Sequence, residues 1–199
     1  MIPTLGIVGG IGSGKSLVAE ALVALGGYTI RADQLGHDAL REAGIRARLV
    51  ERWGDRVLND QGEIDRRTVG HLVFADANEL RALETLVLPF IEKRILEESA
   101  RARMNPGVKF IILDAAILFE TGWHRHCDKV FFVDAPCPLR LARLKEKRGW
   151  TKADVVRREK AQMPNEEKKR RADAILLNDA DPEKVVRQVQ DALVRWKMI

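Results

Sequence analysis

The stretch LGIVGGIGSGKSLVAEAL, from Leu5 to Leu22, places four glycines within six consecutive residues. An apolar run precedes these glycines and an amphipathic pattern follows them, which predicts a buried strand over Leu5–Gly9 and a helix over Ser16–Leu25. Because glycine weakens the interior of either element, its concentration at the junction indicates a turn with a special backbone requirement. The stretch therefore predicts a strand, a glycine-rich loop and a helix in succession.

The glycine-rich loop fits the pattern G-x-x-x-x-G-K-S, with Gly9, Gly14, Lys15 and Ser16 at its fixed positions. Glycines let backbone N–H groups turn inward around an anion, and the helix that follows directs the positive end of its dipole at the same anion. Lys15 can reach the β- and γ-phosphates of a nucleotide, and the Ser16 hydroxyl can be a ligand of Mg²⁺. We expect ATP to be bound by Gly9, Gly10, Ile11, Gly12, Ser13, Gly14, Lys15, Ser16 and Leu17.

Four further apolar runs predict strands, because each is short and rich in β-branched, leucine or aromatic residues. They are Tyr28–Ile30, Lys109–Asp114, Lys129–Asp134 and Ala174–Asn178. Helical spacing of apolar residues separates the runs, and strands that alternate with helices predict a parallel sheet covered on both faces. The predicted fold class is α/β, with three layers around a five-stranded parallel sheet.

A helical insert is expected between the second and third strands, from about residue 33 to residue 106. Within it, a helix is expected to start afresh at Pro89, because proline lacks the N–H group that continues a helix. Later helices are expected from about Pro138, over Lys152–Gln162 and over Pro182–Trp196.

Carboxylates follow two of the predicted strands. Asp33 comes shortly after the second strand, and Asp114 ends the third. Since the carboxyl ends of parallel strands meet at one edge of a sheet, we expect both side chains near the glycine-rich loop. Asp114 suits the metal side of a phosphoryl-transfer site, and Asp33 can accept a proton from an acceptor hydroxyl as general base. The alternative for either residue is a helix cap, a position where aspartate is favoured.

The net charge of +5 is concentrated in one segment. Arg140–Arg171 contains 13 basic and 5 acidic residues, which leaves 21 basic and 24 acidic residues elsewhere. Arg140 and Arg143 lie on one face of the predicted helix in LRLARLKEKRGW. We expect a basic helical lid over about residues 138–171 that closes over transferring phosphates. The alternative is a solvated helix face.

The apolar runs, the start of the sequence and the cysteines indicate where the protein is found in the cell. No apolar run approaches the roughly 18 residues of a membrane span. The start of the sequence, MIPTLGIVGG, lacks the features of a secretory signal, and two cysteines form no disulfide framework. We therefore expect a cytoplasmic protein with reduced thiols and no membrane partner.

Five motifs, taken together and in order, resemble the dephospho-CoA kinase family. The opening resembles the family's TGGIGSGKS, and RADQLGHD resembles its DAD…AH segment, with Asp33 at the second aspartate. WGDRVLNDQGEIDR is similar to FG…G.IDR, and LDAAILFE to D.PLLFE, which includes Asp114 and Glu120. AQMPNEEKKRRADAILLN is similar to AQ…K…AD..I.N and includes Asn178. The resemblance runs nearly from end to end.

The resemblance implies ATP-dependent phosphorylation of the ribose 3′-hydroxyl of dephospho-CoA, which gives coenzyme A and ADP. It implies a P-loop kinase similar to the nucleoside monophosphate kinases, with a helical acceptor-binding insert and a lid. We expect a single domain over residues 1–199, with 1–32 and 107–199 as its core. The expected catalytic residues are Asp33, Lys15, Arg140 and Arg143; the expected metal ligands are Ser16 and Asp114; and acceptor binding is expected at Asp33, Arg66 and Glu120.

The sequence also departs from the family pattern. Arg31 replaces the first aspartate of DAD, Leu88 replaces the histidine of an HP pair, and Ala115–Ala116 replace a hydrophobic-proline pair. Leu17 follows Ser16 where threonine is usual. None of these changes removes an expected catalytic residue.

Three other functions are considered. Another small-molecule kinase, acting on a nucleotide or nucleoside, shares the loop and the lid. A nucleic-acid-binding ATPase would use the basic segment, although we expect a small-molecule substrate and no nucleic acid. A switch GTPase needs the guanine-reading motif N-K-x-D, and the comparable segment NDAD lacks the lysine. The oligomeric state is not predicted.

Overall fold

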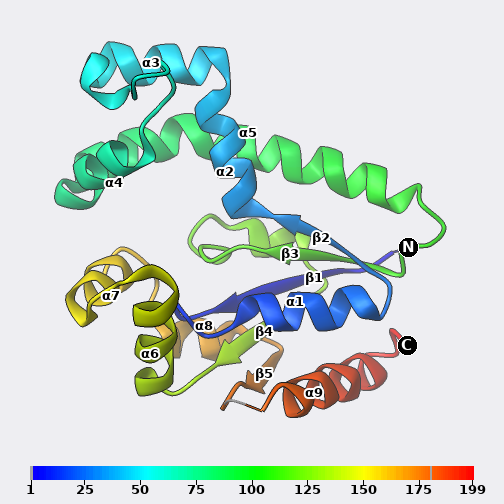
Figure 1. Cartoon of the computed structure of the whole chain (residues 1–199). Coiled ribbons are helices and arrows are strands. Elements are labelled where there is room, and N and C mark those ends of the chain that lie inside the picture. The colour runs from blue at the N-terminus through cyan, green and yellow to red at the C-terminus, as the bar shows by residue number, and fades with distance from the viewer. Residues whose placement is uncertain (1, 180) are drawn as a thin grey trace. The chain divides into compact units, whose positions relative to one another are not determined.

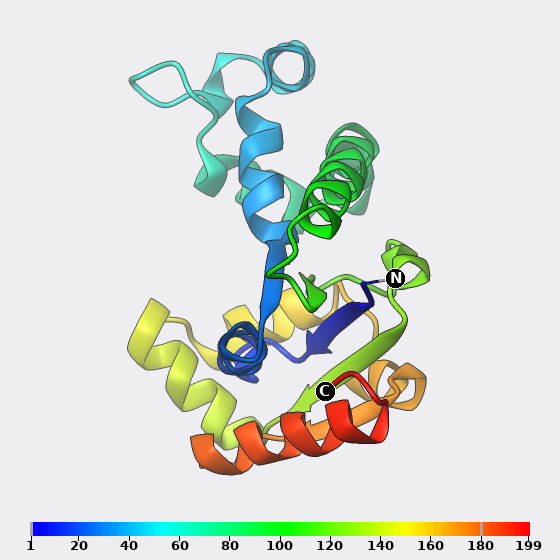
Figure 2. The same cartoon turned by 90° about the vertical axis from the view of Figure 1, so that its right-hand side faces the viewer.

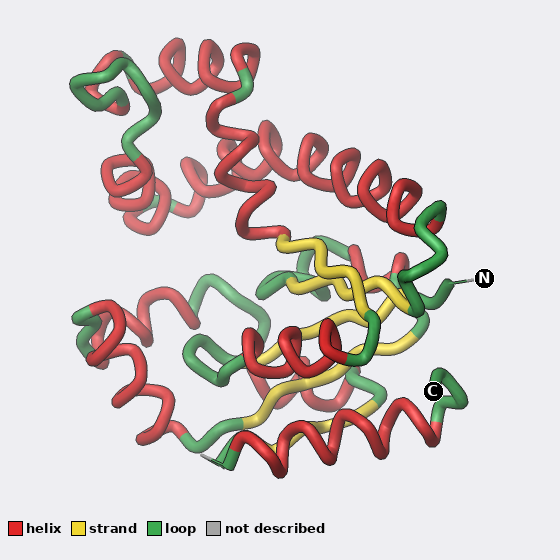
Figure 3. Tube along the Cα trace, turned by 45° about the vertical axis from the view of Figure 1, so that its right-hand side comes forward, coloured by secondary structure: helices red, strands yellow, loops and turns green. Residues whose placement is uncertain are grey.

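The computed structural model describes residues 2–179 and 181–199. Contacts divide the chain into two compact units. The sheet unit comprises the chain up to Arg31 and from Glu98 to Ile199, and the helical unit comprises Ala32–Glu97. In Figure 3 the strands, drawn in yellow, belong to the sheet unit, and the helical unit consists of helices and loops.

A five-stranded sheet forms the centre of the sheet unit (Figure 1). Its strand order is β2-β3-β1-β4-β5, and every neighbouring pair is parallel, which confirms the predicted α/β fold. The strands are β1 (Thr4–Gly9), β2 (Gly27–Arg31), β3 (Phe110–Asp114), β4 (Lys129–Asp134) and β5 (Ala174–Leu177). Each lies within two residues of its predicted bounds. β1 is central because its two neighbours, β3 and β4, are both paired to it along most of its length.

Helices cover both faces of this sheet. On one face, α1 and α9 bury Val18, Leu22 and Val189 against the strand residues Leu5 and Ile7. The other face is covered by the segment after β3, where the Leu118 side chain packs at Gly6, and by α8. The helices of the unit are α1 (Lys15–Ala24), the 3-10 helix η2 (Trp123–His126), α6 (Cys137–Arg148), α7 (Lys152–Glu159), α8 (Asn165–Arg171) and α9 (Pro182–Arg195).

The helical unit is built from helices (Figure 2), and two of them, α3 and α4, have side-chain caps at their N-termini. The Glu42 carboxylate accepts from the N–H group of Ile45 and caps α3, and Asp65 caps α4 by accepting from Arg67. The IDR motif thus has a structural explanation: Asp65 is the cap, and Arg66 is the first residue of α4. The elements are α2 (Ala32–Arg41), α3 (Ala43–Trp53), the 3-10 helix η1 (Asp55–Val57), α4 (Arg66–Ala75) and α5 (Ala77–Arg103), whose last turns belong to the sheet unit.

Two sequence-based expectations differ from the structure. The prediction that a helix starts afresh at Pro89 is wrong, because α5 runs through Pro89 as one helix of 27 residues. The loss of one hydrogen bond at the exposed Pro89 is outweighed by the burial of Ile91 and Ile95 further along the same helix. Helix α8 was not expected, because NEEKKRR contains no apolar residue and has no hydrophobic periodicity.

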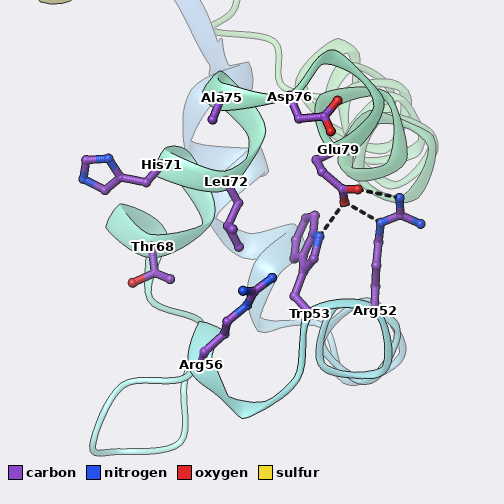
Figure 4. Close-up of a pocket in the computed structure, with 9 residues that line it drawn as sticks. All are labelled: Arg52, Trp53, Arg56, Thr68, His71, Leu72, Ala75, Asp76 and Glu79. Carbon is purple, nitrogen blue, oxygen red and sulfur yellow. Dashed lines mark hydrogen bonds and ion pairs between the residues drawn. The ribbon is translucent and has the colours of Figure 1, made fainter.

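The helical unit also contains an open cavity of about 620 Å³ (Figure 4). The Glu79 carboxylate orders one wall by accepting from Trp53 Nε1 at 2.6 Å and from Arg52 Nε at 2.7 Å. Both hydrogen bonds lower the pKa of Glu79. Arg56 and His71 add polar groups to the lining.

No described helix is both long enough and apolar enough to span a membrane.

Candidate active site

The glycine-rich loop connects β1 to α1 in the sheet unit. Two backbone hydrogen bonds form turns in this region. The N–H group of Ser13 donates to the Gly10 carbonyl, and the N–H group of Leu17 donates to the Gly14 carbonyl, both at 3.0 Å. Gly14 precedes α1 with φ of 92° and ψ of 33°, a left-handed conformation that side chains disfavour. Helix α1 then begins at Lys15, with Ser16 exposed in its first turn.

Side chains outside the loop bind its carbonyl groups. Arg140 Nη1 donates to the Ile11 carbonyl at 3.0 Å, and Asn178 Nδ2 donates to the Ser13 carbonyl at 2.7 Å. In a trans peptide the carbonyl and the following N–H group point in opposite directions. The N–H groups of Gly12 and Gly14 therefore point away from Arg140 and Asn178. Such amides, ahead of a helix N-terminus, form a cradle for an anion.

Two close approaches explain why glycine is needed in this loop. A Cβ atom on Gly14 would lie 2.1 Å from Asn178 Nδ2, and one on Gly10 would lie 2.8 Å from Asn165 Nδ2. The buried Ser13 Oγ has no hydrogen-bond partner among the described residues. Since buried polar atoms are nearly always hydrogen-bonded, this hydroxyl fits a bound phosphate oxygen. The loop thus has the backbone and the donors that ATP phosphates require.

The two arginines expected to clamp phosphates both contact the loop. Arg140 is only 9% exposed and forms an ion pair with Glu159 Oε1 at 2.5 Å, which ties α6 to α7. Arg143 donates to Asn178 Oδ1 at 3.1 Å and to the Ser13 carbonyl at 3.4 Å. Their contact with transferring phosphates stays a prediction. What the structure adds is that both arginines bind the side of the loop that carries the carbonyl groups.

Asp114 is the last residue of β3, as expected. In the sheet it pairs with Ile7 of β1 on one side and with Arg31 of β2 on the other. Strand β1 leads into the loop that ends at Ser16, so neighbouring strands supply a carboxylate and a hydroxyl to the same edge of the sheet. Oxygen ligands of this kind suit Mg²⁺, which also keeps waters and substrate phosphates as ligands. Ser16 and Asp114 therefore fit the predicted metal.

Glu120, expected to bind the acceptor, forms contacts within the chain. Its Oε1 atom lies 2.8 Å from Lys168 Nζ and accepts from the Met163 N–H group at 2.8 Å. The Lys168 side chain is completely buried. The motif AQ…K…AD contains this lysine, but the sequence alone does not show that Lys168 and Glu120 pair.

Within the helical unit, the structure brings Asp33 and Arg66 within electrostatic range of the same residue, His37. Asp33 lies in the first turn of α2, and His37 follows one turn later on the same face. Burial lowers the pKa of His37, and the nearby Arg66 guanidinium lowers it further, while the Asp33 and Asp38 carboxylates oppose this shift. The charges of a general-base candidate and of a cation for an anionic acceptor group thus both act on His37, a residue that sequence reasoning did not select.

Comparison with known proteins shows the family of the chain. The sequence model of the dephospho-CoA kinase family matches residues 3–184. A relative named dephospho-CoA kinase, from Bacillus licheniformis, is 34% identical over 201 residues that cover 100% of this chain and 99% of the relative. The chain belongs to the dephospho-CoA kinase family. It is a kinase, and the predicted family resemblance is confirmed.

Two solved structures have a similar fold. The crystal structure of a Thermus thermophilus protein matches with a TM-score of 0.85 and 32% identity, covering 98% of this chain and 97% of the other. A dephospho-CoA kinase from Campylobacter jejuni matches with a TM-score of 0.71 and 24% identity, covering 98% of each chain, and supports the fold.

Proposed function

We propose that this protein transfers the γ-phosphoryl group of ATP to the ribose 3′-hydroxyl of dephospho-CoA, giving coenzyme A and ADP. The observation that carries the proposal is the combination of a family match over residues 3–184 with a phosphate loop whose amides form an anion cradle. ATP is the phosphoryl donor because the cradle, Lys15 and the N-terminus of α1 together suit the β- and γ-phosphates.

The acceptor hydroxyl must lose a proton as its oxygen attacks the γ-phosphorus. Asp33 is our candidate for the group that orients this hydroxyl and takes its proton. Arg66 is the candidate partner for an anionic group of the acceptor, because it belongs to the same unit and acts on the same histidine as Asp33. Glu120 is a second acceptor candidate from the sequence. The helical insert is thereby proposed to bind dephospho-CoA.

Charge on the transferring phosphoryl group is balanced from the loop and the lid. Lys15 supplies a fixed positive charge. Arg140 and Arg143 hold the loop through its carbonyl groups, and they are our candidates for clamping the phosphates. Mg²⁺, when bound, neutralises charge on the β- and γ-phosphate oxygens, and Ser16 and Asp114 are the residues that would hold it.

We also propose a cytoplasmic enzyme with a small-molecule substrate and no nucleic-acid partner. Several basic side chains of this segment form ion pairs within the chain, which leaves less positive surface to bind a polyanion such as DNA or RNA. Arg140 pairs with Glu159, Lys168 with Glu120, and Lys169 with Asp134 at 2.7 Å. Binding to DNA or RNA that falls steeply with salt would contradict this part of the proposal.

A panel of acceptors tests the proposed substrate. ADP release is measured with ATP and Mg²⁺ in the presence of dephospho-CoA, adenosine or AMP. We expect the highest kcat/KM with dephospho-CoA and a product phosphorylated at the 3′ position by mass spectrometry and NMR. Preferred phosphorylation of AMP or adenosine would identify another small-molecule kinase instead.

The substitution Asp33→Asn tests the general base. Asparagine keeps the size of aspartate and much of its hydrogen bonding but cannot take a proton, so kcat is expected to fall by roughly 10²- to 10⁴-fold. The affinity for ATP should stay close to wild type, because the expected phosphate contacts come from the loop. Asparagine also caps helices nearly as well as aspartate, so a capping role alone predicts an active and stable variant. Full turnover would therefore reduce Asp33 to a structural residue.

A further inference from the structure

The Lys168 ammonium group is buried at a junction of three segments of the sheet unit. Its side chain is 0% exposed, and Nζ lies 2.8 Å from Glu120 Oε1, 2.7 Å from the Ala116 carbonyl and 3.3 Å from Gln162 Oε1. An ammonium group has three donors, and here each has an acceptor. The buried charge is therefore both neutralised and fully hydrogen-bonded.

The three partners come from two separate segments of the chain. Ala116 and Glu120 belong to the segment after β3, which begins directly beyond the predicted metal ligand Asp114. Gln162 lies between α7 and α8, inside the predicted lid of about residues 138–171, and the adjacent Met163 N–H group also donates to Glu120.

Lys168 itself belongs to α8, which begins at the loop. The first residue of α8, Asn165, approaches Gly10 of the phosphate loop. The Lys168 side chain thus connects the segment after Asp114, the segment between α7 and α8, and a helix that approaches the phosphate loop.

Stability alone does not account well for this arrangement. A buried ion pair is often no more stabilising than apolar residues of the same volume, while loss of one partner leaves an uncompensated charge. The directional hydrogen bonds of such a pair instead hold the connected segments in one relative arrangement. The Ala116 carbonyl is held two residues from Asp114, and the Met163 backbone is held between α7 and α8.

We propose that Lys168 and Glu120 are a positioning pair for phosphoryl transfer, which holds the backbone beside Asp114 and the segment between α7 and α8 in register with the phosphate loop. This inference rests on the proposed kinase activity. Neither side chain needs to touch substrate for it to hold. Its consequence is that losing the pair lowers the rate of the chemical step more than it weakens nucleotide binding, because misplacement of reacting groups acts on the transition state.

The test uses Lys168→Met, Glu120→Gln and the double variant of the full chain. Lys168→Met leaves the Glu120 carboxylate half-buried without its cation, so both the melting temperature and kcat should fall. The double variant removes that charge, so the melting temperature should recover most of its loss. Its kcat should stay at least about 10-fold below wild type, with KM for ATP within about two-fold, because the contact with Ala116 is still missing.

Lys169→Met is the matched control, since Lys169 is the next residue of α8 and also forms an ion pair, with Asp134 at 2.7 Å. We expect that variant to keep kcat within about two-fold of wild type. Equal losses in the Lys169 and Lys168 variants would show a general effect of α8 and would overturn the proposal.

Two further outcomes contradict the positioning pair. A double variant with wild-type kcat would show that the contacts are dispensable for catalysis. A Glu120→Gln variant that raises only KM for dephospho-CoA would show that Glu120 binds the acceptor directly. If Lys168→Met does not fold, the double variant decides alone. Wild-type protein that phosphorylates none of the tested acceptors would instead refute the proposed function, which separates the two failures.

Discussion

At the scale of single residues, the phosphate loop shows how much a glycine pattern encodes and what it leaves out. The positive φ of Gly14 and its contact with Asn178 are separate requirements, and glycine satisfies both. The first concerns the backbone alone and recurs at many turns. The second depends on a side chain 164 positions later in the sequence, at the end of β5.

Replacing Gly14 separates the two requirements. In Gly14→Ala the new Cβ would lie 2.1 Å from Asn178 Nδ2, so either the loop or Asn178 must move and the Ser13 carbonyl loses its hydrogen bond from Asn178. We expect affinity for ATP to fall at least about 10-fold, because the amides of the cradle are misaligned. Isothermal titration calorimetry with ATP measures this directly.

Gly149→Ala is the matched control for backbone strain. Gly149 has φ of 66°, and no atom lies within 4 Å of an added Cβ. It should therefore show only the cost of a left-handed alanine, about 1 kcal/mol of stability, with ATP affinity unchanged. Equal loss of ATP affinity in both variants would mean that the contact with Asn178 is unimportant.

Site residues that belong to one short motif could be predicted from the sequence, whereas those whose role depends on contacts between distant segments could not. Gly9, Gly14, Lys15 and Ser16 were predictable, because their spacing within one short stretch carries the chemistry. The contact of Asn178 with the loop was not predictable from spacing, because it depends on which strand ends meet. The same holds for Lys168, whose charged helix gave no sign of burial.

At the scale of elements, the strands could be predicted from their apolar residues, whereas helix boundaries were missed where a local sequence rule and tertiary packing favour different outcomes. β1, β3 and β4 are largely buried, and the edge strands β2 and β5 are short runs rich in β-branched, leucine or aromatic residues, so all five were evident. At Pro89 the local rule favours a helix end, yet residues on both sides of the proline continue one helix. Helix α8 shows the reverse case: its acidic first turn and basic last turn favour a helix, without any apolar period to reveal it.

Helix α5 should become more stable when its proline is removed. Pro89 is exposed and interior, so Pro89→Ala restores one N–H donor and relieves the clash with the preceding turn. Part of that gain is offset by greater freedom of the unfolded chain, and we expect a net stabilisation of about 1–2 kcal/mol. Thermal unfolding should show a rise in Tm of about 2–8 °C.

Lys93→Ala, an exposed change one turn further along α5, is the control for a surface substitution and should shift Tm by much less. A lower Tm in Pro89→Ala would show that the proline imposes a bend on which packing of the helical unit depends.

At the scale of the whole molecule, the candidate residues fall into two sets that belong to different compact units. The phosphate loop, Asp114, the lid and the Lys168–Glu120 pair belong to the sheet unit, whereas Asp33, His37 and Arg66 belong to the helical unit. The sequence indicated this division through a long helical insert between two strands. We therefore expect ATP to bind the sheet unit and dephospho-CoA to bind the helical unit.

Hydrogen exchange measured by mass spectrometry tests that division. A non-hydrolysable ATP analogue with Mg²⁺ should slow exchange at residues 9–17 and in α6 to α8, because its phosphates bind loop amides and order the lid. Dephospho-CoA alone should instead slow exchange in α2 and α4, which carry Asp33 and Arg66. Lys15→Ala should lose the first effect and keep the second, since it alters only the nucleotide site. Protection by dephospho-CoA confined to the sheet unit would refute acceptor binding by the helical unit, because an acceptor held through Arg66 must order the start of α4.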